Sequence, residues 1–150
     1  MRRKNLDAAP CPIARSLDVI GDWWSLLIVR DAFLGRSRFG EFQKSLGLSK
    51  NILTQRLRAL AGDGILEQVP ASDGGAHQEY VLTSKGRGLF PVLVALRQWG
   101  TAQCFDAGAC PTVLVDRDQG LPVRPLELRS ADGRLLNDAD TRLQNSLVRE

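Results

Sequence analysis

Apolar residues recur at helical spacing through the first 60 residues, and glycines or short polar turns separate the segments that they define. The pattern predicts four helices, over residues 12–20, 23–34, 38–46 and 49–61. Pro12 suits the first turn of a helix capped by Cys11, because the missing proline N–H costs nothing there. Ser49 can cap the fourth helix through its hydroxyl. The second helix is apolar on nearly all sides, so it is expected in the core.

Further along the chain, the spacing of the apolar residues changes from helical to alternating. The two runs with this alternation are residues 65–69 and 78–82. They are predicted strands, and the turn-rich segment between them predicts a hairpin. Thr83 or Ser84 can then cap a long helix over residues 84–103, which Pro91 is expected to kink.

The order of these elements is a short helix, a turn, an amphipathic helix and a hairpin. This is the order of a winged helix-turn-helix, a mainly α fold with a small β wing (α+β). In that layout helix 38–46 braces helix 49–61 in the major groove of DNA, and the hairpin is the wing.

The composition is that of an ordinary globular chain, with 43% hydrophobic and 25% charged residues. No apolar run is long enough for a membrane span, and none resembles a signal peptide, so we expect a cytoplasmic protein with no membrane partner. Three cysteines and one histidine are too few for a disulfide framework or a zinc site, and no metal or cofactor is predicted. Without a glycine-rich phosphate loop or a recognisable carboxylate pair, the chain is not predicted to be an enzyme.

Basic residues are concentrated in one part of the chain. The first 100 residues hold 14 Lys and Arg against 9 Asp and Glu, whereas the last 50 hold 6 against 8. Between residues 36 and 58 there are six basic side chains and one acidic side chain, Glu41. This clustering indicates a polyanion-binding surface, although a solvated helix face has the same composition.

The polar face of the fourth predicted helix suits double-stranded DNA. Asn and Gln can make paired hydrogen bonds with adenine, and Lys or Arg can bond guanine. The N–H groups after Ser49 can receive a phosphate, and Arg36 and Arg38 are expected to contact phosphates. Arg56 lies nearer the apolar side, where a buried or interface-facing role within the helix-turn-helix is as reasonable as a phosphate contact. His77 is a solvated residue of the wing tip. The predicted DNA-binding residues are Arg36, Arg38, Ser49, Lys50, Asn51, Thr54, Gln55, Arg58 and His77.

Cys11 has the setting of a reactive thiol. It caps a predicted helix N-terminus, with Arg15 one turn further on, and both the helix dipole and a nearby cation stabilise a thiolate. A redox-sensing role is one interpretation of this residue, and an inert structural cap is the other.

Eight motifs over about residues 10–105 resemble, in their order, those of HxlR-type transcriptional regulators. They are residues 11–15 (CPIAR), 21–28 (GDWWSLLI), 38–42 (RFGEF), 53–60 (LTQRLRAL), 63–66 (DGIL), 79–80 (EY), 82–86 (LTSKG) and 96–100 (LRQWG). The resemblance implies a MarR-like winged-helix fold, a homodimer and DNA binding in promoters. Some family members respond to electrophiles or oxidants through the N-terminal cysteine. The resemblance therefore implies that an electrophile or a small molecule is a possible inducer of this protein. His77 replaces the arginine usual in the wing, and Lys50-Asn51 replaces a common Pro-Lys pair, so the base preference does not carry over.

Together these observations predict a sequence-specific DNA-binding regulator that acts as a homodimer. The alternative is a winged-helix protein–protein interaction module without direct DNA readout, which would present an apolar or acidic face. The first helix and helix 84–103 are the expected dimer elements, because they carry more apolar surface than one small domain covers. Their apolar residues include Ile13, Leu17, Leu89, Leu93, Leu96 and Trp99.

Residues 1–105 form the predicted winged-helix domain, and residues 106–150 form a small extension outside the resemblance. Two β-type runs, 112–115 and 126–129, predict a hairpin there, and a helix is expected from about Asp138 with Leu143 and Leu147 on its apolar face. The extension is similar to a zinc-ribbon-like unit found in some family members. Because Gln119, Arg129 and Asp132 stand where cysteines are expected, we interpret it as a metal-free relic. So small a unit is expected to pack on its own domain or across the dimer.

Overall fold

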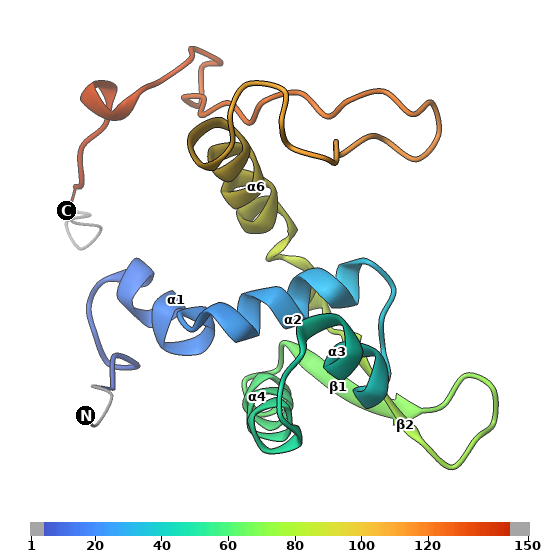
Figure 1. The fold of residues 1–150 in the computed structure, drawn as a ribbon. Helices are drawn as coiled ribbons and strands as arrows, with labels where there is room; N and C mark the ends of the chain where they lie inside the picture. The colour runs from blue at the N-terminus through green and yellow to red at the C-terminus, as the bar shows by residue number, and fades with distance from the viewer. Residues whose placement is uncertain (1–4, 145–150) are drawn as a thin grey trace. The chain divides into compact units, whose positions relative to one another are not determined.

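The computed structural model describes residues 5–144, which form two compact units that divide between Leu93 and Val94. The elements of the first unit are α1 (Pro12–Ile20), α2 (Trp23–Phe33), α3 (Phe39–Leu46), α4 (Lys50–Gly62), β1 (Leu66–Pro70), β2 (Gln78–Leu82) and α5 (Ser84–Arg87) (Figure 1). Helix α6 (Phe90–Cys104) begins in this unit and continues into the second, which also contains the 3-10 helix η1 (Asp138–Asp140). The expected mainly α fold with a small β wing is confirmed. Within residues 5–144 no helix is both long and apolar enough to cross a membrane.

Local polar contacts explain where the helices of the first unit begin. The carboxylate of Asp22 accepts the backbone N–H of Ser25 at 2.9 Å and caps α2. The hydroxyl of Ser49 accepts the N–H of Ile52 at 3.3 Å and caps α4, as predicted. Between α3 and α4, Gly47 has φ of 66°, a left-handed conformation that glycine adopts without a steric penalty. The tight turn of the helix-turn-helix depends on this residue.

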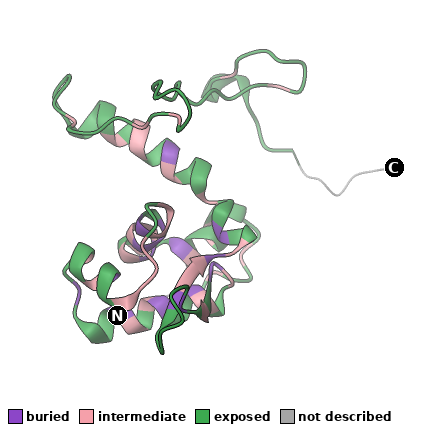
Figure 2. Ribbon diagram, turned by 90° about the vertical axis from the view of Figure 1, so that its right-hand side faces the viewer, coloured by how far each residue is buried: buried purple, intermediate pink, exposed green. Residues whose placement is uncertain are grey.

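The core of the first unit lies where α2, α3, α4 and the hairpin meet (Figures 1 and 2). Its members are apolar residues that repeat at helical spacing in α2 and α4 and at strand ends in the hairpin. The buried core residues are Ile28, Val29, Phe42, Leu48, Leu53, Leu57, Leu60, Ile65, Leu66 and Leu82. The expectation that α2 belongs to the core is therefore confirmed.

The hairpin is antiparallel, with Leu66 opposite Leu82 and Pro70 opposite Gln78. It is fastened to the start of α3 by a backbone hydrogen bond of 2.7 Å, from the N–H of Tyr80 to the carbonyl of Ser37. The wing therefore leaves the domain beside α3, at a position fixed by the backbone.

The turn from β2 into α5 packs closely against the end of α4. The Thr83 hydroxyl donates to the carbonyl of Gly64 at 2.5 Å and accepts the N–H of Gly86 at 3.0 Å. A Cβ on Gly86 would stand 2.2 Å from the carbonyl oxygen of Ile65, far inside van der Waals contact. Only glycine allows this approach of the two backbones, which accounts for the Thr-Ser-Lys-Gly sequence at this turn.

The single long helix predicted over 84–103 is wrong. The chain forms the short helix α5, breaks at Gly88 and Leu89, and restarts as α6. Pro91 stands in the first turn of α6, where a proline needs no N–H partner, and so it marks a helix start and not a kink. Leu89 and Leu93 pack against the core of the first unit, so these two residues are not free for a dimer interface.

The second unit differs from the predicted extension in its pairing. Val123 donates its N–H to the carbonyl of Leu114 at 2.9 Å, and Leu136 donates to Leu128 at 2.9 Å. The segments 112–115 and 126–129 therefore belong to two successive loops and do not pair with each other. Each loop closes on a local turn, with Gly120 or Gly133 at positive φ, which costs less chain entropy than closing one long hairpin.

The helix expected near the end of the extension, with two leucines on its apolar face, also needs correction. The helix expected from Asp138 is a single 3-10 turn capped by the side chain of Asn137, whose Oδ1 accepts the N–H of Ala139. Leu143 is fully exposed, and Leu147 lies outside the described residues. The zinc-ribbon relationship and the boundary at residue 105 stay predictions.

Candidate nucleic-acid interface

Helix α4 presents one polar face on the side opposite its buried leucines. Leu53, Leu57 and Leu60 are fully buried. The residues predicted to face DNA from this helix lie together on the other side, and all are exposed except the half-buried Thr54. They are Lys50, Asn51, Thr54, Gln55 and Arg58. Within residues 5–144 none of these five side chains has a hydrogen bond or an ion pair, so their polar groups are available to an external partner.

The start of α4 adds a further polar feature to this face. Ser49 is exposed, and its hydroxyl engages one N–H of the first helical turn, that of Ile52. The other N–H groups of that turn point out of the helix end, where the helix dipole favours an anion. The predicted phosphate position at Ser49 is thus compatible with the geometry.

Arg36 and Arg30 both approach one buried carboxylate on α2. The Oδ1 atom of Asp31 lies 2.8 Å from Arg30 Nη2 and 3.5 Å from Arg36 Nη1. Asp31 is fully buried. Its single negative charge is neutralised by the two guanidiniums, and the three side chains together retain one positive charge. The half-buried Arg36 is held in place by Asp31, and it leaves excess positive charge beside the start of α3.

Arg56 has an internal role. Its Nε atom lies 3.4 Å from Oδ1 of Asp22, the carboxylate that caps α2. Of the two interpretations of Arg56, the structure favours the one within the domain. This ion pair connects α4 to the N-terminus of α2 and so fixes the direction in which the polar face of α4 points.

Arg38 holds the wing against α3. Its Nη2 atom lies 2.5 Å from Oδ2 of Asp73 at the wing tip and 3.4 Å from Oε1 of Glu79 on β2. Glu79 is buried and also accepts the N–H and the hydroxyl of Ser72, at 3.3 and 3.1 Å. The hydrogen bond and charge of Asp73 raise the pKa of Arg38, and the Arg38 guanidinium together with the Gly75 N–H lowers the pKa of Asp73. Arg38 thus faces two carboxylates, and its predicted phosphate contact stays a prediction.

His77 is exposed beside this cluster. It borders a shallow hollow between α3 and β2, lined also by Arg38, Phe39, Gly40, Glu41, Gln78 and Tyr80. The carboxylate of Glu41 accepts the N–H groups of Ser37 and Arg38, which lowers the pKa of Glu41 and completes the cap of α3. The wing therefore has little free positive charge of its own.

A family model for the HxlR-like helix-turn-helix matches residues 19–107. The chain belongs to the HxlR-like helix-turn-helix family. It is 43% identical over 88 residues to Mb3122, a helix-turn-helix-type transcriptional regulator of Mycobacterium bovis, and this match covers 59% of the chain and 56% of the relative. The chain thus spans little more than half the length of that relative.

Two solved structures extend the comparison. The crystal structure of PA1607, described as a candidate transcription factor, is 56% identical with a TM-score of 0.91, covering 95% of this chain and all of that one. The redox regulator HypR in its oxidised form is 33% identical with a TM-score of 0.56, covering 61% of this chain and 96% of that one. The winged-helix fold is therefore shared, and PA1607 shares nearly the whole chain, including the extension. Because its relatives are transcriptional regulators, the expectation that the chain is not an enzyme is confirmed.

Cys11 occupies the N-cap of α1, as predicted, and is exposed. Its side chain makes no capping hydrogen bond. The guanidinium of Arg15 donates instead to the carbonyl of Ala9 at 2.5 Å, so this cation is directed at the backbone before the helix. Its redox-sensing role stays a prediction.

Sequence reasoning missed the carboxylate partners of the arginines. The charge of Asp73 at the wing tip is neutralised by Arg38, 35 residues away in the sequence, and no local pattern indicates this pair. The Glu79-Tyr80 pair was recognised as a family motif without a role, and the structure shows Glu79 as the buried partner of Arg38. The available signal was an acidic residue within a predicted strand, because a carboxylate that is buried there needs a partner.

If Arg38 holds the wing, replacing it with methionine should loosen the hairpin without unfolding the domain. The Arg38→Met variant leaves the buried Glu79 with only the Ser72 donors, which is costly for a buried carboxylate. We expect roughly threefold to tenfold lower hydrogen-exchange protection at the wing amides, such as that of Ala71, with the α2 and α4 amides unchanged. The Arg58→Met variant is the control, because Arg58 has no ion pair among the described residues.

Acid should have the same effect on the wild-type wing. Since the pKa of Asp73 is lowered in the folded protein, its contribution is present above the unfolded value of about 4 and disappears as the pH falls below it. Protection factors, corrected for intrinsic exchange, should therefore fall below about pH 4 in the wild type and less in Arg38→Met. Equal acid sensitivity of the two proteins would show that Arg38 does not fasten the wing.

Proposed function

We propose that the chain is a sequence-specific DNA-binding transcriptional regulator that acts as a homodimer. The observation that carries this proposal is the polar face of α4, which has five hydrogen-bonding side chains and no internal partner for any of them among the described residues. A helix of 13 residues is about 20 Å long, enough to lie in a major groove with its N-terminal half against the base edges. Lys, Asn, Gln and Arg are the residues that read those edges.

The alternative, a winged-helix module for protein contact, agrees less well with the same face. Such a surface should be apolar or acidic, with its side chains in a desolvated cluster. The face of α4 has two cations, Lys50 and Arg58, and two amides, Asn51 and Gln55, and contains no carboxylate. Polar side chains of this kind bury poorly against protein but match the phosphates and base edges of a duplex.

A second copy of the chain is proposed because one helix-turn-helix reads too short a site for specificity in a genome. The apolar residues of α1 support a dimer. Ile13 is 70% exposed and Leu17 48% exposed on one face of this helix, and Trp23 at the start of α2 is 73% exposed. On α6, Leu96 and Trp99 are also exposed. Surfaces of this kind are expected at an interface and are costly in water.

A thiol switch is the proposed route of regulation, and the structure offers two candidate thiols. Cys11 is exposed at the N-terminus of α1, where the helix dipole acts on it. Cys110 is half-buried, and hydrogen bonding with the Thr112 backbone and the Thr101 hydroxyl, together with the nearby Arg97, lowers the pKa of its thiol. We retain Cys11 as the candidate switch because it belongs to the winged-helix unit.

The first prediction concerns DNA. In vitro selection should recover a pseudo-palindromic duplex with half-sites about one helical turn apart, bound with an affinity that falls steeply with salt. Asn51→Ala and Gln55→Ala should lose about 5- to 150-fold for the selected site, with little change for random duplex. Arg36→Ala should weaken both and flatten the salt slope, whereas Arg117→Ala in the extension serves as the unaffected control. Salt-independent binding, or no enriched duplex, would end this proposal.

The second prediction concerns assembly. A carboxylate in an apolar interface is strongly unfavourable when unpaired, so Leu17→Glu should dissociate the dimer, seen as monomer in sedimentation at micromolar concentration. Arg15→Glu, on the opposite side of α1, is the matched control and should remain dimeric. A wild-type chain that sediments as a monomer at that concentration would contradict the homodimer.

The third prediction concerns the order in which the three thiols react with an electrophile. Cys11 is exposed at a helix N-terminus, whereas Cys110 is half-buried and Cys104 stands at a helix C-terminus. Under limiting iodoacetamide, Cys11 should therefore be modified before Cys104 and Cys110, and operator affinity should change with its modification. Cys11→Ser should abolish the response, whereas Cys104→Ser should leave it intact. If Cys110 is modified first while DNA binding is unchanged, Cys11 is a structural cap and the switch is not at α1.

A further inference from the structure

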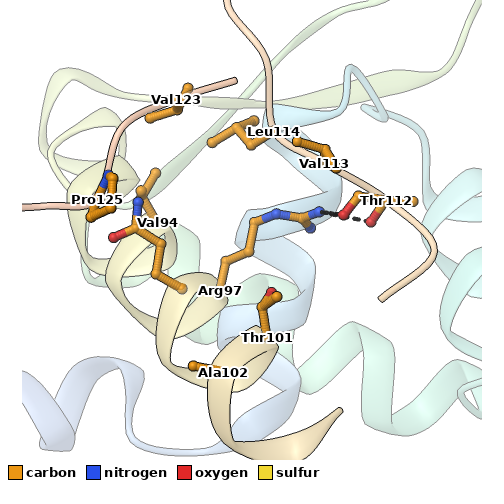
Figure 3. Close-up of a pocket in the computed structure, with 10 residues that line it drawn as sticks. Val94, Arg97, Thr101, Ala102, Thr112, Val113, Leu114, Val123 and Pro125 are labelled. Atoms are coloured by element: carbon orange, nitrogen blue, oxygen red, sulfur yellow. Dashed lines mark hydrogen bonds between the residues drawn. The ribbon is translucent and has the colours of Figure 1, made fainter. Parts of the chain in front are cut away.

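The second unit contains a pocket of about 440 Å³ between α6 and the loops that follow it (Figure 3). Its walls are mostly apolar: Val94 and Ala102 on the helix, Val113 and Leu114 on one loop segment, and Val123 and Pro125 on the other. Four polar residues complete the lining, and these are Arg97, Gln98, Thr101 and Thr112. The volume is in the range of pockets that bind small molecules.

Two polar side chains of α6 hold these walls in place. Arg97 Nη2 donates to the carbonyl and to the hydroxyl of Thr112, at 2.6 and 2.7 Å, as Figure 3 shows. Gln98 donates to the carbonyl of Arg124 at 3.0 Å and accepts the N–H of Leu126 at 2.9 Å. The pocket is therefore bounded by segments that are hydrogen-bonded to the helix, and it does not depend on a second ligand to bring them together.

Arg97 is the charged group of this pocket. Its side chain is half-buried, and no carboxylate among the described residues pairs with it. A guanidinium has five N–H donors on three nitrogens, and only Nη2 has partners here. The Nε and Nη1 donors remain, and each can donate a hydrogen bond to a carboxylate oxygen of a bound anion. Removal from water strengthens such a pair.

We propose that this pocket binds a small hydrophobic carboxylate, with its carboxylate on Arg97 and its hydrocarbon part against the apolar walls. The assignment follows from charge complementarity: the lining offers one unpaired cation and six apolar residues, which is the complement of an amphipathic monoanion. The ligand would be an effector of the regulator proposed above. Its role as an effector rests on the proposed function, whereas its binding to the pocket does not. The binding test uses no DNA, so its failure and a failure of DNA recognition are separate results.

The experiment titrates the full-length protein with 3-phenylpropanoate, and in parallel with its neutral amide, 3-phenylpropanamide. Calorimetry gives the affinities, and backbone amide spectra show where each probe binds. We expect shifts at the amides of residues 112–114 and 123–126, with the carboxylate bound about 10- to 100-fold more tightly than the amide. Equal affinity for the two probes, or shifts confined to other residues at millimolar concentration, would overturn the proposal.

Variants separate the charge from the shape of the pocket. Arg97→Met should lose the preference for the carboxylate, and Arg117→Met, an exposed arginine of the same unit outside the lining, should retain it. Because Arg97→Met also removes the bonds to Thr112, Ala102→Phe provides a second test that fills the pocket and leaves Arg97 intact; it should abolish binding of both probes. Undiminished binding by Ala102→Phe would exclude the pocket as the site. If the amides of Val113 and Val123 shift with protein concentration and not with either probe, a second copy of the chain covers this face and the proposal is wrong.

Discussion

The burial of one side of α4 determines most of what the first unit exposes. Leu53, Leu57 and Leu60 pack into the core formed with α2, α3 and β1, and each fully buried leucine contributes roughly 1.5–3 kcal/mol. Because those three leucines are buried, the helical period places Lys50, Asn51 and Gln55 on the exposed side of α4. A rotation of α4 about its axis would bury polar side chains that have no internal partner. The polar face is therefore oriented by the apolar one, and a DNA-reading surface follows from core packing.

Ion pairs complete this orientation, because they separate two groups of basic residues. Arg38 and Arg56 are paired with carboxylates and hold the wing and α4 to their neighbours. Arg58 and Lys50 lie on the same helix as Arg56, yet have no partner among the described residues. Composition counts all four as basic residues of one cluster. The geometry divides them into residues that hold the wing and α4 in place and residues that remain available to a polyanion.

The helices and the wing of the first unit could be predicted because each is encoded locally. Ser49, Gly47 and the spacing of Leu53 and Leu57 act within one or two helical turns, so the sequence shows them directly. The break at Gly88 was missed because Pro91 fits either a kinked helix or a helix start, and the packing of Leu89 on the core decides between them. The Arg38–Asp73 and Arg38–Glu79 pairs were missed because their partners are 35 and 41 residues apart in sequence.

In the second unit the same reasoning leads to a different conclusion, because its apolar residues are not enclosed. Val94 is its one buried hydrophobic residue among those described, so its loops are held by hydrogen bonds from Arg97 and Gln98 and by local turns. The Asp116 carboxylate accepts three backbone N–H groups, which lowers its pKa and closes the first loop without a packed core. Apolar surface that a fold leaves uncovered is unfavourable in water, and it persists where something else covers it. In this unit the uncovered surface surrounds an arginine with no carboxylate partner among the described residues. An apolar partner alone would leave that guanidinium desolvated and unpaired, whereas an amphipathic anion satisfies both the surface and the charge.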